Sequence, residues 1–132
     1  MSLRITAISA VFLFGFSHAA HAFTQPKHQT LLLQQQYLKE INQCATPSSF
    51  SRLVDKALRS PNPERTAKFA MSIEEMIVQN PACFVEASIK IGKSKCQKLE
   101  AMFIQEPHFY PRENLKQSLS STHLYSQSCF AG

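Results

Sequence analysis

Four cysteines constrain the fold of this chain more than any other feature of its sequence. They are separated by 39, 13 and 33 residues, with no C-x-x-C pair and no clustered histidines beside them. A zinc site normally shows such close pairs, so the spacing favours two structural disulfides over a metal site. Paired cysteines are not nucleophiles, so we expect no catalytic thiol. The four residues are Cys44, Cys83, Cys96 and Cys129.

The first 22 residues have the pattern of a secretory signal peptide. Arg4 is the only Lys, Arg, Asp or Glu among the first 26 residues, and an almost wholly apolar run occupies residues 5–16. This run is shorter than the roughly 20 apolar residues that a membrane-spanning helix needs. Ala20 and Ala22 are the small residues that a signal peptidase reads. We therefore predict cleavage after Ala22, no membrane span, and a single exported domain at residues 23–132, periplasmic or secreted.

The charge balance of the chain is mildly basic. Without Arg4 it holds 13 Lys and Arg residues against nine acidic ones, a net charge of +4. That excess is too small to predict nucleic-acid binding. Four lysines do cluster, and we interpret them as a solvated surface at a helix turn, with a docking patch for an acidic partner as the alternative. They are Lys90, Lys93, Lys95 and Lys98.

Prolines that follow a polar residue mark three of the six expected helix starts. Pro47, Pro63 and Pro81 each follow Thr or Asn, and apolar residues recur at helical spacing after each of them. Sustained strand-like alternation is missing. We predict an all-α fold, a compact bundle of about five or six short helices stabilised by two disulfides. The expected helices cover residues 33–44, 47–58, 63–77, 81–91, 96–103 and 111–120.

One of these helices should be central. The segment 81–91 is apolar nearly all round, which is typical of a helix buried on every side. Gly92 suits the position just after its end, where a left-handed backbone is common. The first helix, by contrast, should show one apolar face, formed by Leu33, Tyr37, Ile41 and Cys44.

Helix geometry narrows the disulfide pairing. If the helices on either side of Gly92 form an antiparallel hairpin, Cys83 lies about 13 Å from the turn and Cys96 about 6 Å, at about 1.5 Å per residue. That offset of about 7 Å, added to a helix spacing of about 8–10 Å, exceeds the reach of a disulfide. Cys83–Cys96 is therefore the least expected bond. We favour Cys44–Cys83 with Cys96–Cys129, and pairing of Cys44 with Cys96 and Cys83 with Cys129 stays open.

The sequence carries no recognisable catalytic, cofactor or metal motif. The histidines beyond residue 22 are His28, His108 and His123, which form no H-E-x-x-H and no i, i+4 pair. Glu74 and Glu75 are about 100° apart on a helix, so we expect them to diverge and not to share a substrate. No G-x-S-x-G elbow or glycine-rich phosphate loop is present. We predict a binding domain with no metal or cofactor; an enzyme assembled from scattered residues is the alternative.

The segment 106–114 is the candidate binding site. Two prolines bracket its centre, so it cannot continue the preceding helix and should form a stiff loop. It concentrates residue types that are enriched in binding hot spots. The alternative is that its two aromatic residues fold back to cover the core. We predict that four residues contact a partner protein: His108, Phe109, Tyr110 and Arg112.

The overall architecture resembles that of the periplasmic immunity proteins that neutralise type VI secretion peptidoglycan amidases. The likeness is carried by the signal ending Ala20-His21-Ala22, the four cysteines and the helical hairpins between them. It implies a protein that binds a cell-wall amidase effector and inserts a loop or helix end into its active-site cleft. No inhibitory residue carries over by motif. A secreted effector or virulence factor and a periplasmic adaptor or chaperone are the alternatives, and a homodimer stays open.

Overall fold

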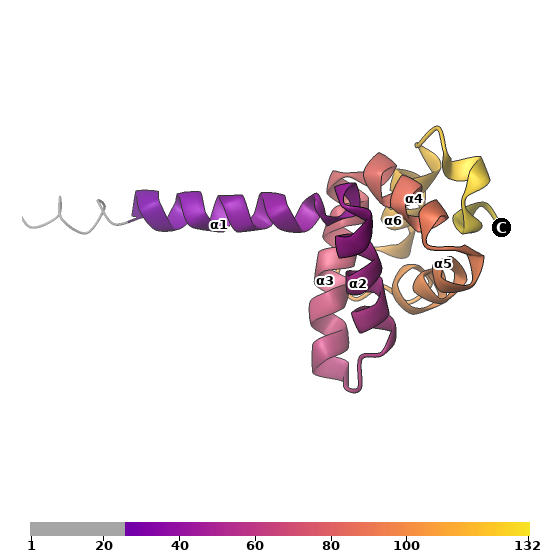
Figure 1. Cartoon of the computed structure of the whole chain (residues 1–132), viewed down its shortest axis with the longest axis horizontal. Coiled ribbons are helices and arrows are strands. Elements are labelled where there is room, and N and C mark those ends of the chain that lie inside the picture. Colours follow the sequence, from indigo (N-terminus) through magenta and orange to yellow (C-terminus); the bar gives the residue numbers. More distant parts are fainter. Residues whose placement is uncertain (1–25) are drawn as a thin grey trace, which may run out of the picture. The chain divides into compact units, whose positions relative to one another are not determined.

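The structure is a computed structural model that describes residues 26–132, with side chains from residue 30 onward. The predicted signal peptide lies outside the described residues. The chain divides into two units at Leu33, and only the start of α1 is described in the first of them. Every regular element of the described residues is helical (Figure 1). The α-helices are α1 (Pro26–Ile41), α2 (Pro47–Leu58), α3 (Pro63–Gln79), α4 (Pro81–Lys90), α5 (Lys93–Leu99) and α6 (Arg112–Ser120).

The three helix starts predicted from proline are confirmed. Pro47, Pro63 and Pro81 are the first residues of α2, α3 and α4. The cap that precedes α3 is a true side-chain cap, because the carboxamide oxygen of Asn62 accepts a hydrogen bond of 2.9 Å from the Arg65 N–H. Such a bond satisfies one of the backbone donors that a helix start leaves unpaired. The predicted all-α fold with two disulfides is therefore confirmed.

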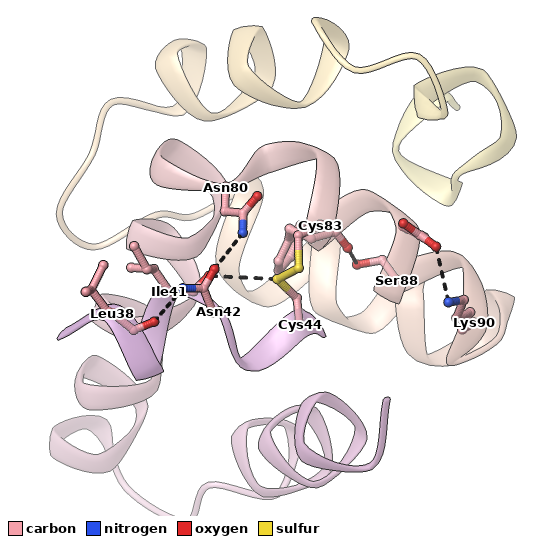
Figure 2. The surroundings of a disulfide bond; sticks show 10 residues. Leu38, Ile41, Asn42, Cys44, Asn80, Cys83, Ser88 and Lys90 are labelled. Atoms are coloured by element: carbon pink, nitrogen blue, oxygen red, sulfur yellow. Dashed lines mark hydrogen bonds and ion pairs between the residues drawn. A yellow bond between two sulfur atoms is a disulfide. The ribbon is translucent and has the colours of Figure 1, made fainter. Parts of the chain in front are cut away.

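The first helix ends earlier than the sequence pattern suggested. α1 stops at Ile41, and Cys44 lies in a separate 3-10 turn instead of on the helix. The carboxamide of Asn42 donates to the Leu38 carbonyl oxygen at 2.8 Å, which satisfies an acceptor that the ending helix leaves open. The turn brings Cys44 to within 5.6 Å of Cys83, measured between Cα atoms, and the two form a disulfide (Figure 2).

The fifth helix changes its winding halfway. After Leu99 the chain continues as a π-helical turn, Glu100–Ile104, in which the Gln105 N–H donates to the Glu100 carbonyl oxygen at 2.9 Å. The wider turn shifts the helical register, so Leu99, Phe103 and Ile104 are all buried. The helix expected at residues 96–103 is thus an α-helix followed by a π-helix, and the loop at residues 105–111 begins where the π-helix ends.

The helix α4 lies at the centre of the core, as predicted. It contacts α2, α3, α5 and α6. The Phe84 ring is fully buried between two other aromatic rings, with centroid distances of 5.6 Å to Phe50 and 5.8 Å to Phe130. Gly92 follows α4 with φ of 94°, a left-handed conformation that side chains disfavour, which explains why the helix ends there.

A disulfide links the carboxyl-terminal segment to α5. Cys96 and Cys129 form the second disulfide, with Cα atoms 6.0 Å apart, so the favoured pairing is confirmed. The Tyr125 hydroxyl also donates to the Phe130 carbonyl oxygen at 2.9 Å. Within the part of the chain that the structure describes, no helix is long and apolar enough to cross a membrane.

Both disulfides should stabilise the fold by similar amounts. They close segments of 39 and 33 residues, and the loss of chain entropy depends only logarithmically on that length. We expect the double variants C44S/C83S and C96S/C129S each to lose about 2–5 kcal/mol in free energy of unfolding while retaining helical circular dichroism. Urea unfolding measures this. A loss below about 1 kcal/mol for either variant would show that the bond does not constrain the unfolded chain.

Candidate functional site

The predicted binding segment is a loop that runs along α3. Residues 105–111 connect the π-helical turn to α6 and form no regular secondary structure. Contacts with the side chains of α3, 34–36 residues earlier in the sequence, hold the loop in place.

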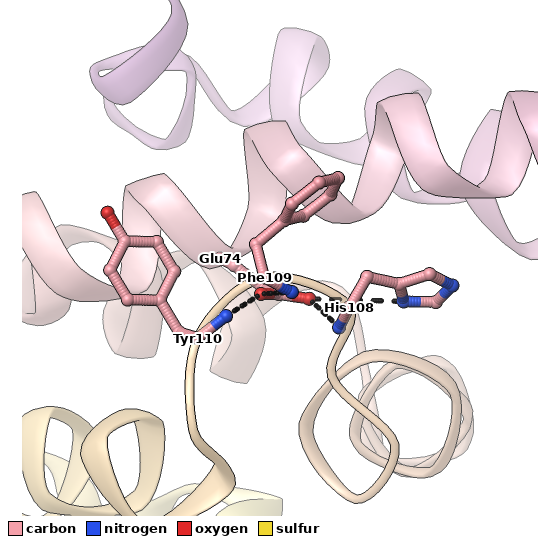
Figure 3. A network of polar contacts seen from close by, with 4 residues as sticks. All are labelled: Glu74, His108, Phe109 and Tyr110. Atoms are coloured by element: carbon pink, nitrogen blue, oxygen red, sulfur yellow. Dashed lines mark hydrogen bonds and ion pairs between the residues drawn. The ribbon is translucent and has the colours of Figure 1, made fainter.

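Glu74 is the main anchor of the loop. Its side chain projects from α3 and is fully buried, and its carboxylate accepts hydrogen bonds from three consecutive backbone N–H groups (Figure 3). The His108 N–H lies 2.6 Å from Oε1, while the Phe109 and Tyr110 N–H groups each lie 2.8 Å from Oε2. Consecutive N–H groups that converge in this way form a concave anion site, and here the anion is part of the same chain.

These three hydrogen bonds satisfy the buried carboxylate of Glu74 and the N–H groups of the loop at the same time. A buried carboxylate without hydrogen bonds is strongly unfavourable, and so are buried N–H groups without acceptors. Hydrogen bonds that involve a charged group contribute about 1.5–3 kcal/mol each, more than neutral ones. Three such bonds on successive residues therefore fix the backbone of the loop as firmly as a turn of helix.

Glu75 binds the same loop from the next position on α3. Its Oε1 accepts a hydrogen bond of 2.7 Å from the Tyr110 hydroxyl, and its Oε2 accepts one of 3.1 Å from the Tyr37 hydroxyl. The bond to Glu75, together with partial burial, raises the pKa of Tyr110 to about 12. Partial burial, and then the same carboxylate, also raise the pKa of Tyr37. The two glutamates were expected to diverge, but both bind Tyr110: Glu74 accepts from its backbone N–H and Glu75 from its hydroxyl.

The two aromatic residues of the loop, Phe109 and Tyr110, have different surroundings. Tyr110 is partly buried and packs against the core, as the alternative interpretation of the loop supposed. Phe109 does not pack against the core, and it is 51% exposed. His108 lies beside it, with a side chain 35% exposed and Nδ1 3.9 Å from Glu74 Oε1. Arg112 is the first residue of α6, and its exposed guanidinium lies 3.6 Å from the Glu113 carboxylate.

A shallow groove lies next to His108. Its volume is about 520 Å³, and it separates the loop from the turn between α2 and α3. The exposed Phe109 follows His108, which lines the groove. An open groove with an exposed aromatic residue next to one of its lining residues resembles part of a protein interface more than the enclosed pocket of an enzyme. The groove is lined by Ser60, Pro61, Asn62, Pro63, Thr66, Ala101, Met102, Glu106 and His108.

The role of Glu74 was not predicted from the sequence. Ala70, Ile73 and Ile77 form a buried stripe along α3, and Glu74 occupies the i+4 position of that stripe. A carboxylate on the apolar face of a helix needs buried donors, so this position was the available signal. What the sequence did not indicate is which donors these are, because they come from backbone N–H groups that no side-chain pattern marks.

Two other observations bear on the site. No group of three or more His, Cys, Asp or Glu side chains among the described residues is placed to hold a metal ion. The lysine cluster noted in the sequence is partly neutralised, because Lys90 pairs with Glu86 at 3.2 Å and Lys95 pairs with Asp55 at 2.8 Å. This pairing favours the solvated-surface interpretation of the cluster over a docking patch.

Comparison with known proteins does not assign the site. The chain matches no protein-family model, no curated protein and no solved structure. The contacts and charges of the described residues are therefore what any functional proposal must rest on.

The phenol of Tyr110 provides a test of this network. Its pKa is raised above that of an unfolded tyrosine, so its hydrogen bond stabilises the fold fully below pH of about 10 and is lost as the pH rises toward about 12. In Glu75→Gln the charged acceptor is gone, and we expect the pKa of Tyr110 to fall toward about 10. Phenolate absorbance during alkaline titration measures this. An unchanged titration would contradict the network.

Proposed function

We propose that this chain is an exported, non-enzymatic protein-binding domain that presents the loop at residues 105–111 to another protein. One observation carries the proposal: Glu74 fixes the backbone of the loop through three hydrogen bonds, while the neighbouring Phe109 ring stays 51% exposed. Contact between an apolar ring and water is unfavourable, and burial of the Phe109 ring against a partner would remove part of that contact.

The anchored backbone favours tight binding. Ordering a loop upon association normally costs free energy, and here the ordering has already occurred during folding. Burying the exposed half of the Phe109 side chain would contribute about 1–1.5 kcal/mol. Aromatic and arginine side chains are also the residues that most often dominate binding energy, and Arg112 lies beside the loop with its guanidinium exposed.

For the identity of the partner we propose a peptidoglycan amidase effector, with this chain as the immunity protein that inhibits it. Two disulfides suit an oxidising compartment such as the periplasm. The signal pattern and helical architecture resemble such immunity proteins, and a rigid surface loop with an exposed aromatic side chain suits contact with the rim of a catalytic cleft. The competing functions make different predictions: a secreted effector would accumulate in the culture medium, and a chaperone would bind many unfolded proteins.

The loop can be tested on purified type VI amidase effectors. We expect the wild-type chain to bind one of them and to inhibit its hydrolysis of peptidoglycan. Phe109→Ala and Arg112→Ala should each weaken binding by about 2 kcal/mol, roughly a 30-fold rise in dissociation constant. Their melting temperatures should stay near that of wild type, because both side chains are exposed. Isothermal titration and thermal melting on the same samples measure both quantities.

Two control variants make the result interpretable. His123→Ala removes an exposed side chain in the turn after α6 and should change neither affinity nor stability. Tyr110→Ala removes a side chain that packs on the core and should lower the melting temperature. A Phe109→Ala variant that is less stable but binds normally would refute the loop as the contact. Binding without inhibition would refute the immunity role alone.

A further inference from the structure

A second surface with the properties of a binding site lies on the outer side of the α2–α3 hairpin. A cavity of about 570 Å³ opens there, with four cationic side chains around a partly buried phenylalanine and no acidic residue in its wall. It is lined by Lys56, Arg59, Ser60, Pro61, Arg65, Lys68 and Phe69. A neighbouring cavity of about 360 Å³ shares Lys56 and Phe69 and adds Lys39, Arg52 and Leu53 among its lining residues. We refer to the two together as the α2–α3 basic groove.

The sequence spacing explains why these charges gather. On α2, Arg52, Lys56 and Arg59 follow one another at i, i+4 and i+7, which places them on one face of the helix. On α3, Arg65 and Lys68 are three residues apart and also share a face. Because α2 and α3 pack side by side, the two cationic faces adjoin (Figure 1).

The charges of the groove are poorly neutralised by the protein itself. None of the ion pairs among the described residues involves Lys56, Arg65 or Lys68. Three acids are adjacent in sequence to cations of the groove: Glu40, Asp55 and Glu64. Asp55 is already bound by Lys95 at 2.8 Å, which lowers the pKa of Asp55, and none of these ion pairs involves Glu40 or Glu64. Cations in a cleft without counter-charges attract anionic ligands and raise their association rate.

We propose that the α2–α3 basic groove binds an acidic peptide segment of a partner protein, with an apolar side chain against Phe69 and carboxylates on either side. The floor of the groove is apolar, formed by Phe69, Leu53 and Pro61. A sulfated or phosphorylated glycan would leave that floor in contact with water, and a lipid acyl chain needs an enclosed apolar channel, which this open groove lacks. A peptide that combines acidic and aromatic residues matches both the rim and the floor.

This site is distinct from the loop at residues 105–111. The turn that contains Ser60 and Pro61 lies between the groove beside His108 and the basic groove, and contributes to the walls of both. The inference goes beyond the proposed function, because it would hold for any partner that carries such a segment, whether or not the loop binds an amidase.

The probe for the test is a fluorescent synthetic peptide that alternates glutamates with one central phenylalanine. We expect it to bind the intact chain, and binding should weaken when the salt concentration rises from about 0.1 M to about 1 M, because the screening length falls from about 10 Å to about 3 Å. K56Q/R65Q should weaken binding about tenfold or more. The matched control K93Q/K98Q removes the same charge from exposed sites elsewhere and should stay within about twofold of wild type.

Four results would overturn the proposal. Equal weakening in K56Q/R65Q and K93Q/K98Q would mean that only net charge matters. Equal binding of a peptide whose phenylalanine is replaced by alanine would mean that Phe69 takes no part. Binding of heparin or of phosphatidylglycerol vesicles without binding of the peptide would assign the groove to a glycan or a membrane. Phe109→Ala must bind the peptide normally, since a loss would place the peptide on the loop instead.

Discussion

The buried carboxylate of Glu74 determines the path of the chain between the fifth and sixth helices. Without its three hydrogen bonds to the loop, the charged side chain would be buried without a partner, and three N–H groups of the loop would lose their acceptor. The carboxylate and the loop backbone therefore depend on each other, and changing only one of them should lower the stability of the fold. Since α6 begins directly after the loop, its placement against α3 depends on the same interaction.

The remainder of the domain holds α3 in the position from which Glu74 acts. Its apolar stripe packs into the core around Phe84, the central residue of α4. The disulfide Cys44–Cys83 fixes the segment before α2 to the start of α4, and the hydrogen bond between the side chains of Asn42 and Asn80 joins the same two segments at 3.0 Å (Figure 2). Because Glu74 belongs to this buried stripe, the packing that holds α3 in the core also holds the carboxylate that anchors the loop.

The sequence was informative about elements with local signals. Proline after a polar residue marked three helix starts, Gly92 marked a helix end, and axial offsets made Cys83–Cys96 the least expected bond. Features that depend on distant segments were missed. The end of α1 at Ile41 depends on the contacts of Asn42 and Cys44, and the π-helical turn on the packing of Phe103.

For both candidate sites, the sequence indicated residue types but not how distant segments bring them together. The residue types of the loop were predicted, but not which of its aromatic rings packs on the core, because that choice follows from Glu74 and Glu75 on another helix. The cations of the α2–α3 basic groove are spread over residues 39–68, where no run of charge draws attention to them. Only the packing of two helices side by side turns them into one surface.

Amide hydrogen exchange tests the central claim most directly. In the wild-type protein, the N–H groups of His108, Phe109 and Tyr110 should exchange slowly, although they belong to a surface loop. In Glu74→Gln, the side-chain amide must turn a donor toward one of these groups, and the loss of a charge-assisted bond should speed exchange by about 10- to 150-fold. The Phe84 amide, in the core, should be unaffected. Fast exchange of the three amides in the wild type, or rates that Glu74→Gln leaves unchanged, would contradict the claim that this carboxylate fixes the loop.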